Sequence, residues 1–182
     1  MTQARAIFET PRLIVRAWTD RESDVDRIFD IYSRWEVARW LGAVPRAMAG
    51  RDEAVSAVSR WAARTDEARG LGLWAVEVRA TGVVAGSIAL MPMPGEGGEV
   101  EVAWHFHPDS WGNGYATEAA RGALARGFDH GLAELYAVVR PDNGPSLAVC
   151  RRLGMTPLGR TDRWYGQQVE AFRQTAAEHR EE

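Results

Sequence analysis

A strand pattern runs into a helix pattern in Glu99-Val-Glu-Val-Ala-Trp-His-Phe-His-Pro-Asp-Ser-Trp-Gly-Asn-Gly-Tyr-Ala-Thr-Glu118. Apolar and polar residues alternate up to His107, as is typical of a strand, and Gly112 and Gly114 precede the helix. The first N–H groups of a helix lack partners within it and carry partial positive charge, so they attract anions. A side chain at either glycine would hold a diphosphate away from them. The segment therefore predicts a pocket for a phosphorylated ligand.

The residues around the glycines narrow the choice of ligand. A dinucleotide-binding loop would have a third glycine where this chain has Thr117, which weighs against nicotinamide-dependent reduction. The chain contains no lysine, which excludes Schiff-base enzymes and lysine-dependent P-loop enzymes. Gly114-Tyr-Ala116 fits the G-x-A core of the pyrophosphate loop in acetyl-coenzyme A dependent transferases.

Three ordered blocks, which together span nearly the whole chain, carry a family resemblance. They are Thr10–Trp18, His107–Ala120, and Pro141–Ser146 leading to Arg152-Leu-Gly-Met155. With these blocks the chain resembles the GNAT superfamily of N-acetyltransferases, within it the RimJ/RimL-like branch of ribosomal-protein alanine N-acetyltransferases. The resemblance implies transfer of an acetyl group from acetyl-CoA to a primary amine by direct attack on the thioester. The acceptor would be a protein N-terminus or a small molecule. The alternative is an acyl-CoA-binding sensor or regulatory module with little transferase activity.

Composition sets the broad class of the protein. Its 182 residues, 46% of them hydrophobic, suit a single domain. The resemblance implies that this domain, over residues 1–182, is an N-acetyltransferase domain. A formal net charge of −3 gives no reason to expect nucleic-acid binding. One cysteine, no long uncharged apolar run and no signal pattern indicate a cytoplasmic protein without a membrane partner. The oligomeric state stays open, with a homodimer as one alternative.

The order of the elements predicts an α/β fold, with a mixed sheet and helices on both faces. The resemblance implies that this central sheet is GNAT-like and largely antiparallel. A capping-box pattern at Thr19-Asp-Arg-Glu22 predicts the first helix, and Thr81-Gly82 predicts a hairpin turn. On the helix over 52–68, Val55, Val58, Trp61 and Ala62 are expected to face inward, and residues 176–182 to be frayed. Strands are expected at 13–18, 73–78, 83–91, 99–107, 134–139, 156–163 and 168–174. The first helix is expected to run through residues 25–32. Further helices are expected from 116 to about 130 and at 145–153, with a short segment at 35–41 and a loop at 92–98 bordering the acceptor site.

The chemistry requires a base, because an alkylamine with a pKa of about 10 is mostly protonated at neutral pH. Glu101, His105 and His107 are separated by even numbers of residues, so their side chains lie on the same face of the strand. The resemblance assigns the role of base to Glu101, against the alternative of a solvated or salt-bridged carboxylate. His105, at an ordinary histidine pKa, is the second candidate. These three side chains could in principle bind a metal, but we expect no metal.

The resemblance also implies which residues bind the cofactor. The strand end would lend backbone groups of His105, Phe106 and His107 to the pantetheine arm, and a backbone N–H near Phe106 would stabilise the oxyanion. Asn143 would hydrogen-bond the arm, with Ser146 beside it at a helix start, where Asn143 can also serve as the cap. The diphosphate loop would comprise Trp111, Gly112, Asn113, Gly114, Tyr115, Ala116 and Thr117.

The general acid departs from the family pattern. Much of the superfamily has a tyrosine where this chain has Cys150. We expect Cys150 to be a buried packing residue. Ser146 and solvent are then the expected route for a proton to the leaving thiolate.

Overall fold

A computed structural model describes residues 5–180 of the chain. Its eight strands form one mixed sheet in the order β1-β2-β3-β4-β5-β6-β8-β7, and every neighbouring pair is antiparallel except β5 and β6. The strands are β1 (Ala6–Glu9), β2 (Leu13–Arg16), β3 (Gly72–Val78), β4 (Val84–Pro92), β5 (Val100–Phe106), β6 (Glu134–Val139), β7 (Thr156–Thr161) and β8 (Val169–Thr175). The helices are α1 (Glu22–Tyr32), α2 (Trp35–Ala38), α3 (Arg51–Ala63), α4 (Tyr115–Asp129), α5 (Gly144–Arg152) and α6 (Ala176–Arg180), with a short 3-10 helix at Pro108–Ser110. The predicted mixed α/β fold is confirmed.

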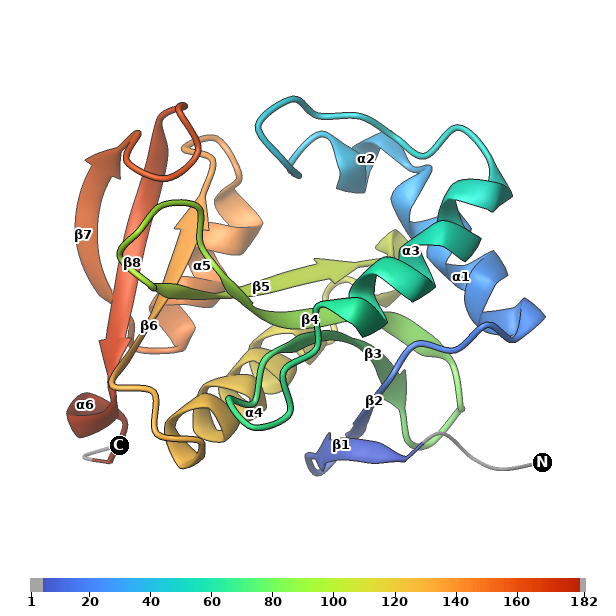
Figure 1. Ribbon diagram of the computed structural model, residues 1–182, viewed down its shortest axis with the longest axis horizontal. Coiled ribbons are helices and arrows are strands. Elements are labelled where there is room, and N and C mark those ends of the chain that lie inside the picture. Colours follow the sequence, from blue (N-terminus) through green and yellow to red (C-terminus); the bar gives the residue numbers. More distant parts are fainter. Residues whose placement is uncertain (1–4, 181–182) are drawn as a thin grey trace.

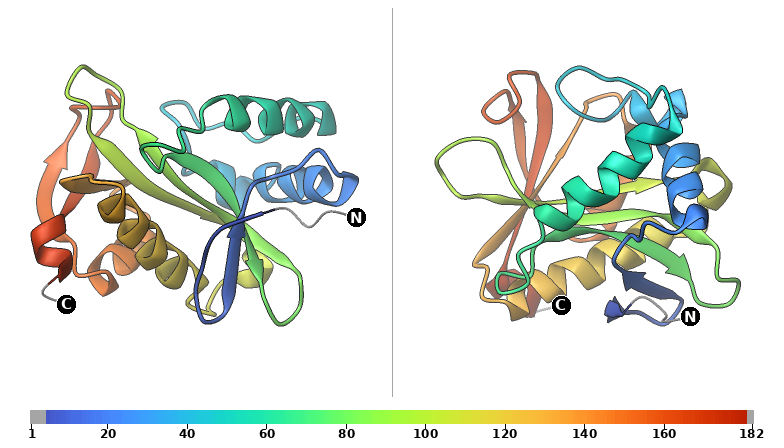
Figure 2. Two further views of the ribbon diagram at one scale, coloured as in Figure 1. Left: turned by 60° about the horizontal axis from the view of Figure 1, so that its bottom comes forward. Right: turned by 45° about the vertical axis from the view of Figure 1, so that its right-hand side comes forward.

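Helices cover both faces of the sheet. Figure 2 shows α1 and α3 on one face and α4 on the other. The larger apolar core lies between the sheet and α4 and includes Ile88, Ala120 and Leu124. A second core under α1 and α3 includes Ile28 and Ala57. The larger core includes Val100, Val102 and Phe106 of β5, so it packs this strand in the middle of the sheet.

Strands β5 and β6 meet at one end and then diverge, as Figure 1 shows. Their parallel pairing has a single register pair, Glu101 with Tyr136. On its other edge β5 pairs with β4 from Val100 through Phe106 without a break. The carboxyl-terminal half of β5 therefore has an opening beside it.

Of two local predictions, the hairpin turn and the capping box, the structure confirms the first only. The hairpin turn at Thr81-Gly82 is confirmed, because Gly82 has a φ of 71° and joins β3 to β4. The capping box at residues 19–22 is wrong: α1 begins after Arg21, and the Thr19 hydroxyl donates instead to the Asp24 carboxylate at 2.7 Å. Asp24 also pairs with Arg16, so this carboxylate outcompetes the helix end for Thr19.

Three further predictions need correction. The helix expected over 52–68 is α3, which ends at Ala63. Val55 and Ala62 of α3 are exposed, whereas Ala54 and Ala57 are buried, because small side chains let α3 approach α1 closely. The segment 176–180 is helical rather than frayed, and residues 181–182 lie outside the described part. In residues 5–180 no helix is both long and apolar enough to cross a membrane.

Candidate functional site

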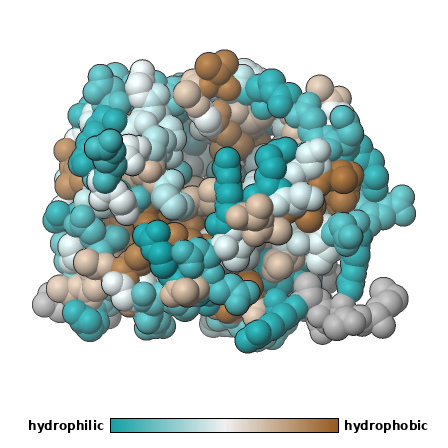
Figure 3. All heavy atoms as spheres, viewed as in Figure 1, coloured by the Kyte–Doolittle hydropathy of each residue, from teal (hydrophilic) through white to brown (hydrophobic). Residues whose placement is uncertain are grey.

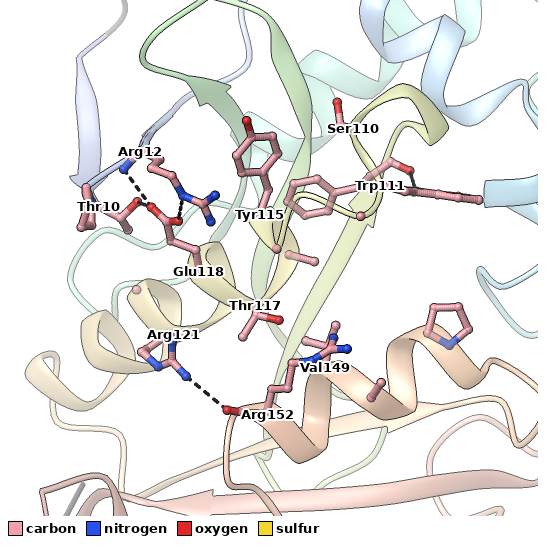
Figure 4. Close-up of a pocket in the computed structure, with 18 of the residues that line it drawn as sticks. Thr10, Arg12, Ser110, Trp111, Tyr115, Thr117, Glu118, Arg121, Val149 and Arg152 are labelled. Atoms are coloured by element: carbon pink, nitrogen blue, oxygen red, sulfur yellow. Dashed lines mark hydrogen bonds and ion pairs between the residues drawn. The ribbon is translucent and has the colours of Figure 1, made fainter.

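A groove beside the start of α4 forms the first part of the site (Figure 4). This α4 groove has a volume of about 980 Å³, and its lining includes Gly112, Gly114 and Tyr115. Gly112 and Gly114 have φ values of 78° and 77°, a left-handed conformation that favours glycine. A Cβ built on Gly112 would meet no atom within 4 Å, so there is open space in front of the loop.

The start of α4 leaves backbone donors free. Gly114 is the N-cap residue, with no side-chain cap, and the N–H of Glu118 is the first to bond back, to the Gly114 carbonyl at 3.1 Å. The N–H groups of residues 115–117 precede that bond and have no partner within the helix. Helix start and groove together fit an anionic group such as a diphosphate.

Glu118 fixes the rim of the groove. Its carboxylate accepts hydrogen bonds from the Thr10 hydroxyl at 2.6 Å, the Arg12 backbone N–H at 2.9 Å and the Arg12 Nε at 2.6 Å. Burial opposes ionisation, but these hydrogen bonds lower the pKa of Glu118 below its ordinary value. Glu118 thereby ties the segment before β2 to α4 (Figure 4).

The far end of the groove is basic. Arg121 and Arg152 both line it, and the Arg121 Nη2 donates to the Arg152 backbone carbonyl at 3.1 Å. Guanidinium groups bind phosphate oxygens through several parallel donors. The residues present thus fit a coenzyme that carries more than one phosphate.

A second cavity continues from the groove toward the sheet. This α5 cavity, of about 330 Å³, shares Phe106, Trp111, Gly112 and Ala116 with the α4 groove and adds His105, Asn143 and Ser146. The Asn143 Oδ1 accepts from the Ser146 backbone N–H at 3.3 Å, so Asn143 is the cap of α5. The capping role predicted for Asn143 is confirmed.

The backbone of Phe106 faces the opening between β5 and β6. The His107 N–H donates to the Ala85 carbonyl of the sheet at 2.9 Å. Because donors alternate between the two edges of a strand, the Phe106 N–H points away from β4 toward the opening. The Phe106 carbonyl accepts from the Trp111 Nε1 at 2.8 Å, which fixes this strand end against the α4 loop.

On the other side of the opening lies a third cavity, centred on Glu101. This Glu101 cavity, of about 390 Å³, is lined by Glu101, His105, Arg140 and Tyr165 among others. A small gap of about 80 Å³ between β5 and β6 shares His105 with both the α5 cavity and the Glu101 cavity. The face carrying the Glu101 cavity is hollowed between the β8 side and the α2 segment (Figure 3).

Glu101 is partly buried and hydrogen-bonded. The Tyr165 hydroxyl donates to the Glu101 Oε1 at 2.7 Å. Burial raises the pKa of Glu101, and the hydrogen bond from Tyr165 opposes the rise. A carboxylate with a raised pKa is a stronger base than an exposed one, so burial favours Glu101 as a proton acceptor.

His105 is in a different state from the one predicted. Its Nδ1 lies 3.0 Å from the Tyr32 hydroxyl, which also lies 2.9 Å from the Ser87 hydroxyl. Burial lowers the pKa of His105 to about 4. The expectation of an ordinary histidine pKa is therefore wrong, and the imidazole is neutral at neutral pH.

The structure brings most of the predicted site residues together along these cavities. Glu101, His105, Phe106, Trp111, Gly112, Gly114, Tyr115, Ala116, Thr117, Asn143 and Ser146 each line at least one of them. His107 and Asn113 do not. His107 is buried, with its Nε2 3.0 Å from Asp30. The Asn113 side chain donates to backbone carbonyls of its own loop, the nearest contacts being 3.1 Å.

Cys150 is fully buried in the larger core, as predicted, and burial raises the pKa of its thiol to about 12. Within residues 5–180 no cluster of three or more His, Cys, Asp or Glu side chains could hold a metal ion.

Several functional candidates were not predicted, Arg121 and Arg152 of the α4 groove among them, and three more lie near β5. Tyr165 lies between β7 and β8, Arg140 follows β6, and Tyr32 ends α1. Each reaches the site through a contact with a residue distant in sequence, so no local period marks it.

Comparison with known proteins places this geometry in context. The family described as "Acetyltransferase (GNAT) domain" matches residues 12–156. An uncharacterized N-acetyltransferase of Bacillus subtilis, YoaA, is 32% identical over 154 residues, which cover 84% of each chain. The structure of a GNAT-family acetyltransferase from Bacillus anthracis has a TM-score of 0.74 at 21% identity, covering 96% of this chain and 98% of the other. RimL, a ribosomal L7/L12 α-N-protein acetyltransferase solved with coenzyme A, has a TM-score of 0.76 at 16% identity, with coverage of 94% and 98%.

Proposed function

We propose an acetyl donor, a base and a proton route for this protein, which belongs to the GNAT acetyltransferase family and is accordingly an N-acetyltransferase. The donor is acetyl-CoA, which supplies an acetyl group activated as a thioester. The acceptor is a primary amine, on a small molecule or a protein N-terminus. The proposal takes residues 1–182 as one domain of a cytoplasmic enzyme.

The observation that carries the proposal is the continuity of the three cavities. The α4 groove, with its free helix N–H groups, leads through the α5 cavity to the opening between β5 and β6. The Glu101 cavity begins on the other side of that opening, and His105 lines both. A phosphorylated donor entering along α4 and an amine entering beside Glu101 would meet at the carboxyl-terminal half of β5.

On the donor side, the backbone N–H groups at residues 112–117 would bind the diphosphate. Arg121 and Arg152 would bind a further phosphate at the far end of the groove. Backbone groups of β5 near Phe106, together with Asn143, would hold the pantetheine arm. The hydrogen bond from the Trp111 Nε1 to the Phe106 carbonyl supports this, because it fixes the strand end that the arm would follow.

On the acceptor side, Glu101 would accept the proton of the amine, directly or through a water. The amine nitrogen would then form its bond to the carbonyl carbon as the carbon–sulfur bond breaks. The Phe106 N–H would stabilise the negative charge that develops on the carbonyl oxygen. Ser146, which lines the α5 cavity, or solvent would return a proton to the departing thiolate.

Release of free thiol from acetyl-CoA in the presence of an amine panel tests the proposal. Glu101→Gln should reduce release by roughly 100-fold or more while leaving coenzyme A affinity similar. Glu170→Gln is the matched control, because Glu170 is a strand glutamate paired with Arg160 outside the cavities. Tight binding of acetyl-CoA without thiol release from any amine would favour the alternative, an acyl-CoA sensor.

A further inference from the structure

The Glu101 cavity contains two arginine side chains that the proposed proton transfer does not use. Arg64 follows α3 and Arg140 follows β6, so they reach the cavity from different elements. Among the described residues that line this cavity, Glu101 is the one carboxylate. Two guanidinium groups therefore share a cavity with a single acid, which is itself hydrogen-bonded to Tyr165.

One hydrogen bond holds the Arg140 side chain in place, and other N–H groups of its guanidinium have no partner among the described residues. Its Nη2 donates to the Gly42 carbonyl at 2.9 Å, and Gln167 donates to the same oxygen at 3.2 Å. The Arg140 Nε is buried and has no hydrogen-bond partner in the part of the chain that the structure describes. The guanidinium has further N–H groups besides the Nη2 donor that binds Gly42, and these are available to a ligand oxygen in the cavity that Arg140 lines. The contact with Gly42 leaves the guanidinium already oriented for such a ligand.

Arg64 is exposed at the cavity mouth. Its backbone N–H donates to the Trp61 carbonyl at 3.2 Å, but its guanidinium makes no hydrogen bond or ion pair within residues 5–180. Most of the other arginines near α1 and α3 have a carboxylate partner, as Arg46 has Glu53 and Arg51 has Asp26. The free charge of Arg64 therefore adds to that of Arg140.

The rest of the lining is largely apolar. It includes Trp40, Leu41, Leu73, Met91 and Val138. A volume of about 390 Å³ lies near the lower end of the range for small-molecule sites. The cavity thus suits a compact ligand with an apolar body and an anionic group.

We propose that the acceptor is a small amine that also carries a carboxylate, with an apolar or aromatic body between or beside the two groups. Arg140 and Arg64 bind the carboxylate through charge-assisted hydrogen bonds, and the amino group faces Glu101. The proposal rests on the proposed function, because it concerns the acceptor of that reaction. Polyamines and aminoglycosides are disfavoured, since their remaining cations would face two guanidinium groups.

The test compares acceptors that differ only in the carboxylate. Acceptor binding to the coenzyme A complex is measured by calorimetry, and thiol release is measured with acetyl-CoA. The panel is phenylalanine, phenylalaninamide, phenethylamine, spermidine and a tripeptide that begins with phenylalanine. Rates are expressed per concentration of unprotonated amine, because the amine pKa differs among these compounds. Phenylalanine should exceed its amide by roughly 10- to 100-fold in affinity and in kcat/KM.

Variants of the two arginines test whether they cause the preference for the acid over the amide. Arg140→Gln and Arg64→Gln should each reduce the acid-to-amide ratio about tenfold, through KM rather than kcat. Arg64 is exposed, so its variant tests the proposal even if Arg140→Gln unfolds. Arg60→Gln, one helical turn earlier on α3 and outside the cavity lining, is the charge-matched control and should leave the ratio unchanged.

The outcomes separate the two proposals. Equal affinity for acid and amide, a preference for spermidine, or a preference for the tripeptide over free phenylalanine would overturn the carboxylate proposal while leaving the acetyltransferase intact. Absence of thiol release with every amine would instead contradict the proposed function. In that case the calorimetric comparison of acid with amide still decides whether the arginines select a carboxylate.

Discussion

The Tyr165 hydroxyl donates a 2.7 Å hydrogen bond to the Glu101 carboxylate, so a loop between β7 and β8 sets the state of a side chain on β5. Burial raises the pKa of Glu101 and this hydrogen bond holds the rise in check. The same contact orients the carboxylate toward the cavity that both residues line. Strand β5 sets the position of the proposed base, and the loop that carries Tyr165 affects its pKa.

Removing this hydrogen bond should change the pH profile of the enzyme. Glu101 must be unprotonated to act as a base, so activity rises as pH rises through its pKa. Tyr165→Phe removes a group that favours the charged form, so the acidic limb of kcat/KM should move to higher pH. Tyr136→Phe is the control, because Tyr136 donates to Glu134 and lies outside the Glu101 cavity lining. An unchanged acidic limb in Tyr165→Phe would contradict the role of Tyr165.

Gly114→Ala should weaken coenzyme A binding. The left-handed φ of 77° strains any other residue by about 1 kcal/mol, and the backbone can relax only by shifting the free N–H groups of α4. Gly131→Ala is the matched control, because Gly131 has a φ of 84° just beyond the other end of α4. Calorimetry should show weaker binding for Gly114→Ala alone. Equal affinity in both variants would mean that the start of α4 does not hold the diphosphate.

Glu118→Gln should lower stability by about 1–2 kcal/mol, because it removes charge-assisted hydrogen bonds to Thr10 and Arg12. The pKa of Glu118 is lowered in the folded state, so its contribution is present above the unfolded-state pKa and is lost as pH falls through the folded pKa. Urea unfolding of wild type and variant should therefore differ most at neutral pH and converge in acid, below the ordinary value of 4.5. A pH-independent difference would show that the charge of Glu118 does not matter.

Cys150→Ala should retain turnover. Burial raises the pKa of the thiol to about 12, and the side chain packs in the core rather than along the cavities. Stability should fall modestly because a small cavity forms. Ser146→Ala is the comparison, and it should slow thiol release more than Cys150→Ala does. Loss of turnover in Cys150→Ala with coenzyme A binding intact would identify the thiol as the acid.

The sequence predicts those parts of the site that depend on residues close together in the chain, and it misses those that depend on residues far apart. The alternation along β5 is local, and it correctly predicts that Glu101 and His105 share a face and line one cavity. The partners Tyr165 and Tyr32 lie 64 and 73 residues away from these side chains, so no periodic pattern reveals them. The pKa of His105 was mispredicted for the same reason, because it depends on burial by distant elements.

Helix starts show the same limit. Thr19 and Glu22 fit the capping-box pattern but do not cap a helix, because Asp24 takes the Thr19 hydroxyl. Thr175 and Glu178 form the reciprocal cap, with Thr175 N–H to Glu178 at 2.7 Å and Glu178 N–H to Thr175 at 3.2 Å. That pair begins a helix where fraying was expected. The pattern alone therefore did not identify which of these two helix starts carries a reciprocal cap.

A crystal structure of the protein with coenzyme A bound tests the central claim most directly. The account predicts the diphosphate against the backbone N–H groups of residues 112–117, and the sulfur at the opening between β5 and β6 on the path to Glu101. Coenzyme A bound away from the α4 groove, or with its sulfur pointing away from that opening, would contradict the account.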